Sequence, residues 1–268
     1  MNLNLYSKEI KRSRKNLLIW TSIVIGFTVM VLALYPQMKG MGDHLEQMME
    51  AIPKSLTKAF GMDSTTWASA AGFYSTYFGI YIVVLTSIYT TSTGATILSK
   101  EERDKTAEFL ITKPISRSDL FWTKMMSLAT LMIIITVAQL LAATICMFIV
   151  AEESFPWDKF ATMHIHGTAL IIFFTGTGVL LASFMKAKTN FMGPVVGIVF
   201  GSYFIDALAK ATHATDWLGY TSPFRYASFA ISEPGYSIHY VNVIALVLIG
   251  IGCVYYSSIR FTSKDIDS

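Results

Sequence analysis

The densest cluster of charged side chains is the stretch 99–124, which reads SKEERDKTAEFLITKPISRSDLFWTK. It contains six of the chain's 21 basic residues and five of its 18 acidic residues. Basic residues alone would suffice to hold a loop on the cytoplasmic side of a membrane, so the acidic residues require a second explanation. We interpret the stretch as a docking surface for another protein. A basic anchor with incidental helical order is the alternative.

Local signals divide this stretch into two helices. Two capping boxes predict two helix starts, Ser99-x-x-Glu102 and Ser116-x-x-Asp119. Pro114, which lies between them, cannot continue a helix. We therefore predict one helix over residues 100–111 and a second that begins near residue 117.

A second group of residues has the chemistry of a metal site. Its members are two histidines and three acids: Glu152, Glu153, Asp158, His164 and His166. Histidines two residues apart point to different faces of a helix, which is a poor arrangement for binding one ion unless the segment is extended. Histidines at a membrane interface usually have no ligand role. A membrane-embedded, metal-dependent enzyme nevertheless stays open as an alternative, whereas our leading interpretation has no metal site.

Other catalytic signatures are absent from the sequence. It contains no G-x-x-x-x-G-K-[ST] phosphate loop, no H-E-x-x-H and no G-x-S-x-G. The strongly polar side chains well inside apolar runs are Gln139 and Asp206, although ion-coupled carriers generally need ionisable groups there. An ATP-independent carrier or a structural membrane subunit is therefore a further, weaker alternative.

Composition identifies a membrane protein. The chain of 268 residues is 53% hydrophobic and 15% charged, against about 25% charged in soluble domains, and its mean hydropathy is +0.49. A membrane-spanning helix needs about 20 mostly apolar residues. Six stretches qualify: 17–35, 78–98, 126–150, 167–185, 191–208 and 240–257. We predict one all-α domain of six transmembrane helices covering residues 1–268.

Basic residues predict the orientation. The segments on one side of the six spans carry 15 Lys and Arg residues, and those on the other side carry six. By the positive-inside rule, both termini and the stretch 99–124 face the cytoplasm. Residues 1–16 are predicted to form an amphipathic helix in the headgroup layer, in contact with lipid, before the chain turns in to span. The net charge of +3 reflects this bias and suggests no nucleic-acid partner.

Small and hydroxylated residues mark two of the spans. Gly193, Gly197 and Gly201 repeat at every fourth residue and predict close contact with another helix, in the same subunit or in a second copy. The hydroxyls of Thr86, Thr90 and Thr93 either line a substrate path or serve helix packing.

The last outer connection is the segment 209–239, which is rich in aromatic residues. It is predicted to form either a hairpin that re-enters the membrane or a surface loop.

The stretch 99–124 resembles the cytoplasmic loop of permease subunits of type-2 ABC exporters. The matching features are an acidic start, Thr-x-Glu, an aliphatic run, a proline, Ser-Arg and a lysine where the next span begins, here Glu101, Glu102, Thr106, Glu108, Phe109–Ile111, Pro114, Ser116, Arg117 and Lys124. The rest of the chain agrees, including the N-terminal helix, the six spans, the "SPF" segment before span 6 and the short charged tail. Ala107 departs from the glycine that many members have there.

This resemblance implies a half-channel in a bacterial cell membrane. Two such subunits, identical or related, would form a twelve-helix pore above two copies of a cytoplasmic ATPase. The helix 100–111 would be the coupling helix, and the residues expected to contact the ATPase are Glu101, Glu102, Arg103, Thr106, Glu108, Phe109, Lys113, Pro114 and Arg117. ATP and Mg²⁺ would bind to the ATPase, so this chain is expected to hold no cofactor and to catalyse no reaction itself. A hydrophobic or amphipathic cargo is expected: a peptide toxin, a peptide antibiotic or a lipid-like compound.

Overall fold

Six long apolar helices build the molecule. The computed structural model describes residues 3–41, 47, 51–62, 64–99, 116–151, 155–185, 190–233 and 235–263, and these residues form helices and connections without any strand. The six helices long and apolar enough to cross a membrane are α1 (Leu3–Gly40), Ala70–Ile97, α9 (Arg117–Val150), α10 (Trp157–Phe184), α11 (Met192–Ala211) and α12 (Tyr240–Ser263). Each predicted span overlaps one of them, so the prediction of an all-α protein with six spanning helices is confirmed.

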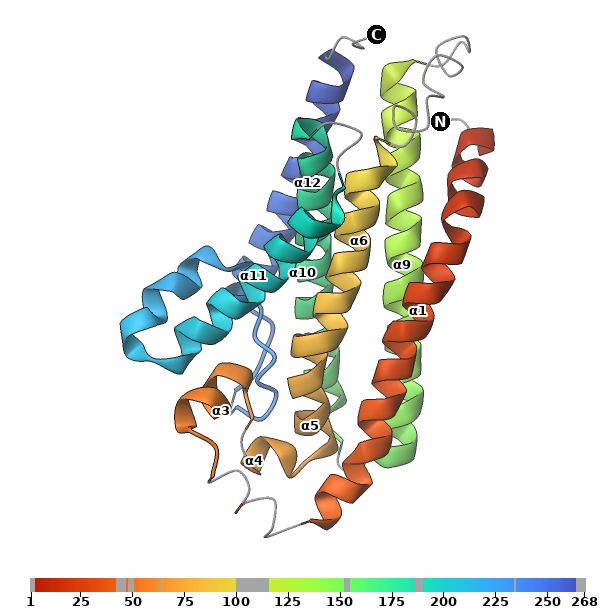
Figure 1. Ribbon diagram of the computed structural model, residues 1–268. Helices are drawn as coiled ribbons and strands as arrows, with labels where there is room; N and C mark the ends of the chain where they lie inside the picture. Colours follow the sequence, from red (N-terminus) through yellow and green to blue (C-terminus); the bar gives the residue numbers. More distant parts are fainter. Residues whose placement is uncertain are drawn as a thin grey trace.

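The second spanning helix is composite, and short helices accompany the bundle. The second spanning helix consists of α5 (Ala70–Tyr77), the π-helix η1 (Phe78–Val83) and α6 (Val84–Ile97). The short helices are α3 (Lys54–Phe60), α4 (Ser64–Trp67) and the 3₁₀ segments η2 (His213–Thr221) and η3 (Pro223–Tyr226). Both termini lie at the same end of the bundle (Figure 1), as an even number of spans requires.

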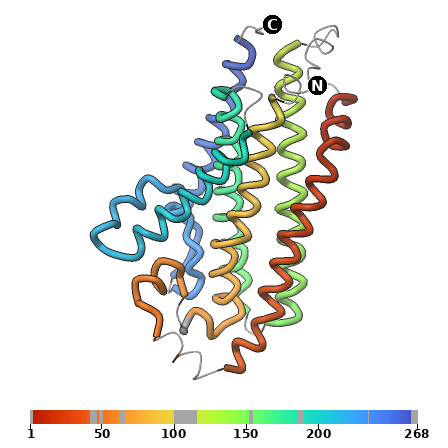
Figure 2. The backbone as a smooth tube through the Cα atoms, viewed as in Figure 1, coloured from red at the N-terminus to blue at the C-terminus, as the bar shows by residue number. Residues whose placement is uncertain are grey.

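The helices pack in two groups. α1 packs chiefly against α9, whereas α10 packs between α6 and α12, and α11 packs against η2 and α3. Figure 2 shows α1 and α9 side by side at one edge of the bundle, with α11 and η2 extending from the other. Each helix pair that joins the two groups, such as α6 with α9 or α12 with α9, makes less contact than α1 makes with α9.

The first helix corrects one prediction. Residues 3–16 are helical, but they do not form a separate interfacial helix that turns at residue 17, because α1 is one helix of 38 residues. No proline interrupts it before Pro36. Its buried side chains form one stripe that passes the expected turn without a shift: Leu5, Glu9, Ser13, Leu17, Val24, Thr28, Val31, Leu32 and Tyr35. The same face therefore packs against the bundle on both sides of residue 17.

Glycines allow α10 to approach both of its neighbours closely. A Cβ atom added to Gly176 would overlap the backbone of Gly250 on α12, and one added to Gly178 would overlap the backbone of Thr91 on α6. The Thr91 hydroxyl donates a hydrogen bond of 3.1 Å to the carbonyl oxygen of Phe174 across the same contact. Small residues and interhelical hydrogen bonds are the usual means of joining helices in a membrane.

The close contact between α10 and α12 gives the first testable prediction. Gly176→Ala places a methyl group against the backbone of Gly250, and overpacking of this kind costs about 1–3 kcal/mol. We expect the midpoint of thermal unfolding of the detergent-purified chain to fall by several degrees. Gly26→Ala on α1 is the control, since a Cβ there meets nothing within 4 Å. Equal midpoints for the two variants would contradict the packing described.

Candidate functional site

The charged stretch 99–124 is described at its two ends. Its central residues lie outside the described part of the chain, and with them most of the predicted docking positions: Glu101, Glu102, Arg103, Thr106, Glu108, Phe109, Lys113 and Pro114. Arg117 is described and is exposed as the first residue of α9. The docking assignment of all these residues stays a prediction. What the structure adds is the way in which the ends of the stretch are anchored.

The second of the two predicted helix caps is confirmed. The Asp119 backbone N–H donates to the Ser116 hydroxyl oxygen over 3.0 Å. The same hydroxyl donates to the Asp119 carboxylate over 2.8 Å. Ser116 is therefore the N-cap of α9, as the S-x-x-D pattern predicts.

At the other end of the stretch, the Ser99 hydroxyl donates back to the carbonyl oxygens of Ala95 and Thr96, each at 3.3 Å. Its predicted capping partner, Glu102, lies outside the described residues. In the structure, the Ser99 side chain thus provides a hydrogen-bond donor to the last turn of α6.

A buried ion pair lies beside these two ends. The Lys124 ammonium of α9 is 3.3 Å from the Glu9 carboxylate of α1 and donates a 2.6 Å hydrogen bond to the carbonyl oxygen of Ile97, the last residue of α6. Both side chains are almost fully buried, with 1% of Lys124 and 3% of Glu9 exposed. Three helices therefore meet at one ammonium group.

Sequence reasoning identified Lys124 as part of the charged stretch but did not predict its partner. A signal existed: Leu5, Glu9, Ser13 and Leu17 follow one another at intervals of four, which places Glu9 on the buried face of α1. Glu9, the acid in an otherwise basic segment, was therefore the residue that the sequence could have indicated as a partner for a buried lysine.

The threonines predicted to line a path face the packed interior of the subunit. Thr86, Thr90 and Thr93 are all buried. Thr90 donates to the carbonyl oxygen of Ser87 over 3.3 Å, and Thr93 donates to that of Tyr89 over 2.8 Å. In this subunit, two of the three hydroxyls therefore satisfy their own helix, which is the packing alternative, while the path assignment remains a prediction.

The uncovered side of the second spanning helix carries different residues. Tyr81 is exposed, and the half-buried side chains on the same side follow at helical intervals: Tyr77, Leu85, Ser92 and Thr96. Tyr81 packs against Phe27 of α1 with ring centroids 4.7 Å apart. This stripe, which we call the open face of the second spanning helix, was missed because the density of hydroxyls drew attention to the covered side.

The histidines of the metal alternative have structural roles. His164 Nδ1–H donates to the Phe160 carbonyl oxygen over 2.9 Å, and its Nε2 faces the Tyr74 hydroxyl at 3.4 Å. Gln139 donates to the same hydroxyl over 2.7 Å. This chain of bonds links α9, α5 and α10 beside a small cavity that Thr86 also lines.

His166 is likewise engaged on both ring nitrogens. Its Nδ1–H donates to the carbonyl oxygen of Ser228 over 3.1 Å, and its Nε2 accepts from the His239 backbone N–H over 3.3 Å. Within the described part of the chain, no three His, Cys, Asp or Glu side chains gather closely enough to hold a metal ion. Glu152 and Glu153 lie outside it.

The glycine stripe of α11 faces outward. A Cβ atom added to Gly193, Gly197 or Gly201 would meet nothing within 4 Å. Of the two predicted partners, a helix of the same subunit is therefore excluded for the described residues. A second copy stays a prediction.

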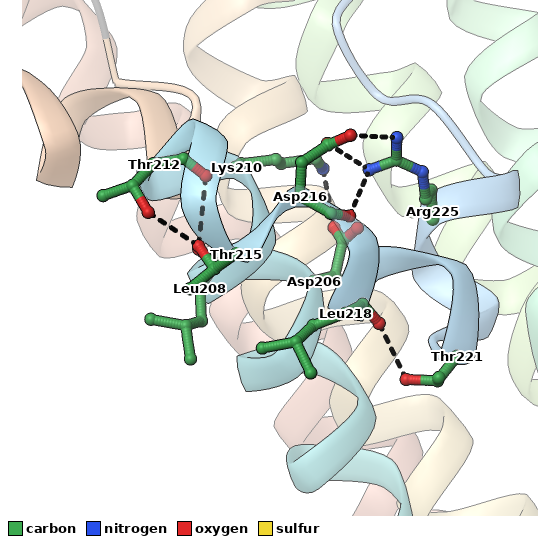
Figure 3. A network of polar contacts seen from close by, with 9 residues as sticks. All are labelled: Asp206, Leu208, Lys210, Thr212, Thr215, Asp216, Leu218, Thr221 and Arg225. Carbon is green, nitrogen blue, oxygen red and sulfur yellow. Dashed lines mark hydrogen bonds and ion pairs between the residues drawn. The ribbon is translucent and has the colours of Figure 1, made fainter.

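A polar network fastens the outer connection to the end of α11 (Figure 3). Asp206, buried on α11, pairs with Lys210 over 2.6 Å. The Arg225 guanidinium holds the Asp216 carboxylate through two bonds of 2.8 and 3.3 Å, which raise the pKa of Arg225 above its ordinary value. η2 and η3 are thereby folded against each other, and the buried ring of Phe224 packs on Tyr203 and Phe174.

The depth of residues 209–239 in the membrane is not fixed by these contacts. Re-entry of this segment stays a prediction.

The comparison with known families agrees with this architecture. Residues 3–266 match the ABC-2 family transporter protein, and the chain therefore belongs to this family. It is a multi-pass membrane protein and the permease subunit of an ABC transporter, not itself catalytic, with the ATPase on a separate chain. No curated protein and no solved structure is detectably similar to it.

The outer network gives the second prediction. Arg225→Met removes both bonds to the Asp216 carboxylate, the longer bond to the Asp216 carbonyl oxygen and the stacking of the guanidinium 4.3 Å above the ring of Tyr220. An exposed ion pair and an exposed cation–π contact together contribute about 1 kcal/mol. We expect amide hydrogen exchange in residues 213–226 to become about fivefold faster, with exchange in α10 unchanged. Arg225→Lys, which retains the charge, should show a smaller increase, and unchanged exchange in Arg225→Met would contradict the network's role.

Proposed function

We propose that this chain is half of an ATP-driven exporter for a hydrophobic or amphipathic substrate. A second permease subunit, identical or related, completes the pore, and the stretch 99–124 couples it to the ATPase. The observation that carries the proposal is the location of this stretch. It connects the ends of two spanning helices, α6 and α9, at the end of the bundle where both termini lie (Figure 1).

The composition of the stretch supports docking. It joins two membrane helices, yet it holds charges of both signs and, toward its end, Phe109, Leu110 and Ile111. Apolar side chains in a cytoplasmic loop are stabilised when a partner covers them, and charges around them provide orientation and specificity. An ATPase with a complementary groove is a partner of this kind.

The charge distribution supports a cytoplasmic location for this end. Five basic residues are exposed in the first turns of α1: Lys8, Lys11, Arg12, Arg14 and Lys15. The acid among them, Glu9, is buried with Lys124 and does not offset their charge at the surface. Such a segment favours the cytoplasmic side and the anionic lipid headgroups found there. Both termini are therefore placed in the cytoplasm in this proposal, and the cell membrane is taken to be bacterial.

The open face of the second spanning helix supports a path for an amphipathic substrate. Its side chains combine aromatic rings with hydroxyls, which suits a cargo with both apolar and polar parts. α6 lies between α1 and α11 (Figure 1), so a second subunit facing this side would enclose the stripe. A peptide toxin, a peptide antibiotic or a lipid-like compound fits this chemistry.

Charge reversal tests the coupling. In Glu101→Lys/Glu102→Lys, repulsion at the docking surface should reduce the amount of ABC ATPase that copurifies with the full-length chain by roughly tenfold, a change of about 1.4 kcal/mol. Mass spectrometry of the copurified protein, with a search for a phosphate-binding loop in its sequence, identifies the ATPase. Glu233→Lys, an exposed position in the segment that follows η3, is the matched control and should bind as wild type. Normal ATPase binding by the double variant would refute the coupling assignment.

A larger side chain on α11 tests the second subunit. A Cβ atom at Gly197 meets nothing within 4 Å, so we expect Gly197→Leu to fold normally while close contact with a second copy is blocked. We expect light scattering in detergent to show loss of the dimer and retention of the monomer. Gly26→Leu on the outward side of α1 should leave the dimer intact. A dimer that persists in Gly197→Leu would remove α11 from the interface.

A further inference from the structure

The Lys124 ammonium joins the two packed groups of helices. α1 and α9 form one group, and α6, α10 and α12 form the other. Lys124 belongs to α9, and its hydrogen bond to the Ile97 carbonyl oxygen reaches α6 over 2.6 Å. Its ion pair with Glu9 holds α1 at the same point. Lys124 therefore supplies a polar connection between the groups at the end of the bundle where the stretch 99–124 begins and ends, beside the apolar cluster that Phe121, Met125 and Leu128 of α9 form with Ile97 and Leu98 at the end of α6.

A contribution to the stability of the fold does not explain why Lys124 and Glu9 are buried as an ion pair. Removing a lysine and a glutamate from water costs free energy that their mutual attraction only partly returns, so well-packed apolar side chains of similar volume stabilise a fold equally well or better. Lys124 and Glu9 are 1% and 3% exposed, and the cost of burial is correspondingly large. Ionisable residues within membrane helices are therefore treated first as functional.

The hydrogen bond from Lys124 to Ile97 is made to the C-terminal end of a helix. Ile97 is the last residue of α6, and the carbonyl oxygens of a helix's last turn lack partners within the helix. These oxygens carry partial negative charge from the helix dipole, which favours an ammonium group there. Lys124 thus binds the C-terminal end of α6, two residues before Ser99. The described part of the chain resumes at Ser116, directly before α9.

We propose that Lys124, held by Glu9 and the carbonyl oxygen of Ile97, is a positioning residue for transport. It fixes both ends of the stretch 99–124 to each other and to α1, so that displacement of this stretch moves the ends of α1, α6 and α9 together. The inference rests on the proposed coupling function for its consequence in transport. The contact itself is independent of any partner.

The mechanical consequence follows from the geometry. The stretch connects a helix of one group to a helix of the other, so a push on it loads the contact between the groups at its ends. Apolar packing around Phe121 resists separation there, and the bonds from Lys124 to Glu9 and Ile97 add contacts of fixed geometry to it. With the link in place, the three helix ends stay together. The displacement is then carried along whole helices toward the opposite end of the bundle.

The test replaces both charges at once. Glu9→Met/Lys124→Met removes the pair without leaving an uncompensated buried charge, so the chain should fold with an unfolding temperature close to that of the wild type. Lys124→Arg retains the positive charge and the donors, and serves as the conservative rescue. The reporter is the distance between spin labels at Lys11 on α1 and Thr96 on α6, measured with Cys146 and Cys253 replaced by serine.

In the free chain, we expect a single narrow distance distribution for the wild type and for Lys124→Arg, and loss of that single peak in the double methionine variant. In the complex with the copurified ATPase, the wild-type peak should be the same without nucleotide and after ATP turnover in the presence of vanadate, which traps ADP. The double variant should shift between those two states while binding the ATPase normally.

Two results would overturn the inference. One is a double methionine variant whose distribution in the free chain is as narrow as that of the wild type. The other is a wild-type distance that changes between the two nucleotide states. The measurement on the free chain needs no ATPase, so its failure refutes the positioning role alone. Failure of the wild-type chain to bring down an ATPase refutes the proposed function alone.

Discussion

A charged side chain away from water must be surrounded by partners, and Lys124 shows how strongly that constraint shapes the bundle. Its ammonium has a carboxylate on one side and a helix-terminal carbonyl oxygen on another. To supply the carboxylate, α1 must continue as a helix into the segment before residue 17 and present Glu9 to α9. The continuous α1 and its unbroken buried stripe are therefore consequences of the same requirement. A helix that turned into the headgroup layer at residue 17 would leave Lys124 without its partner.

Elsewhere the bundle joins its helices with little charge. In hydrocarbon there is no hydrophobic driving force between helices, so close backbone approach and interhelical hydrogen bonds must replace it. Gly176, Gly178 and Gly250 provide the approach, and Thr91 provides a bond across it. A second set of hydrogen bonds links α9, α5 and α10 through the side chains of Gln139, Tyr74 and His164. These polar groups thus serve contact between helices.

The parts of this structure that depend on local sequence could be predicted, and those that depend on pairing at long range could not. Apolar length indicated six spans, and the Ser116-x-x-Asp119 pattern predicted the N-cap of α9 that is present. Glycine spacing did not locate the close contacts within the subunit. The regular stripe at Gly193, Gly197 and Gly201 contacts nothing in the described chain, whereas Gly176 and Gly250, on different helices, form the tight contact. Only the fold brings these two glycines together, just as it brings Glu9 to Lys124 across 115 positions.

The scarcity of ionisable groups inside the spans acquires a reason once the chain is placed among ABC permeases. A carrier driven by an ion gradient must bind that ion within the membrane, and its ionisable residues mark the site. A permease driven by a separate ATPase receives free energy at its surface and needs a mechanical connection instead. That connection requires a charged surface outside the membrane and a firm attachment at the ends of the helices. In the function proposed above, the stretch 99–124 provides the first, and the contact of Lys124 with Glu9 and Ile97 provides the second. In the proposed function, the charge that the spans lack is therefore concentrated where the ATPase docks, and Lys124, buried within the bundle, lies where force passes from loop to helix.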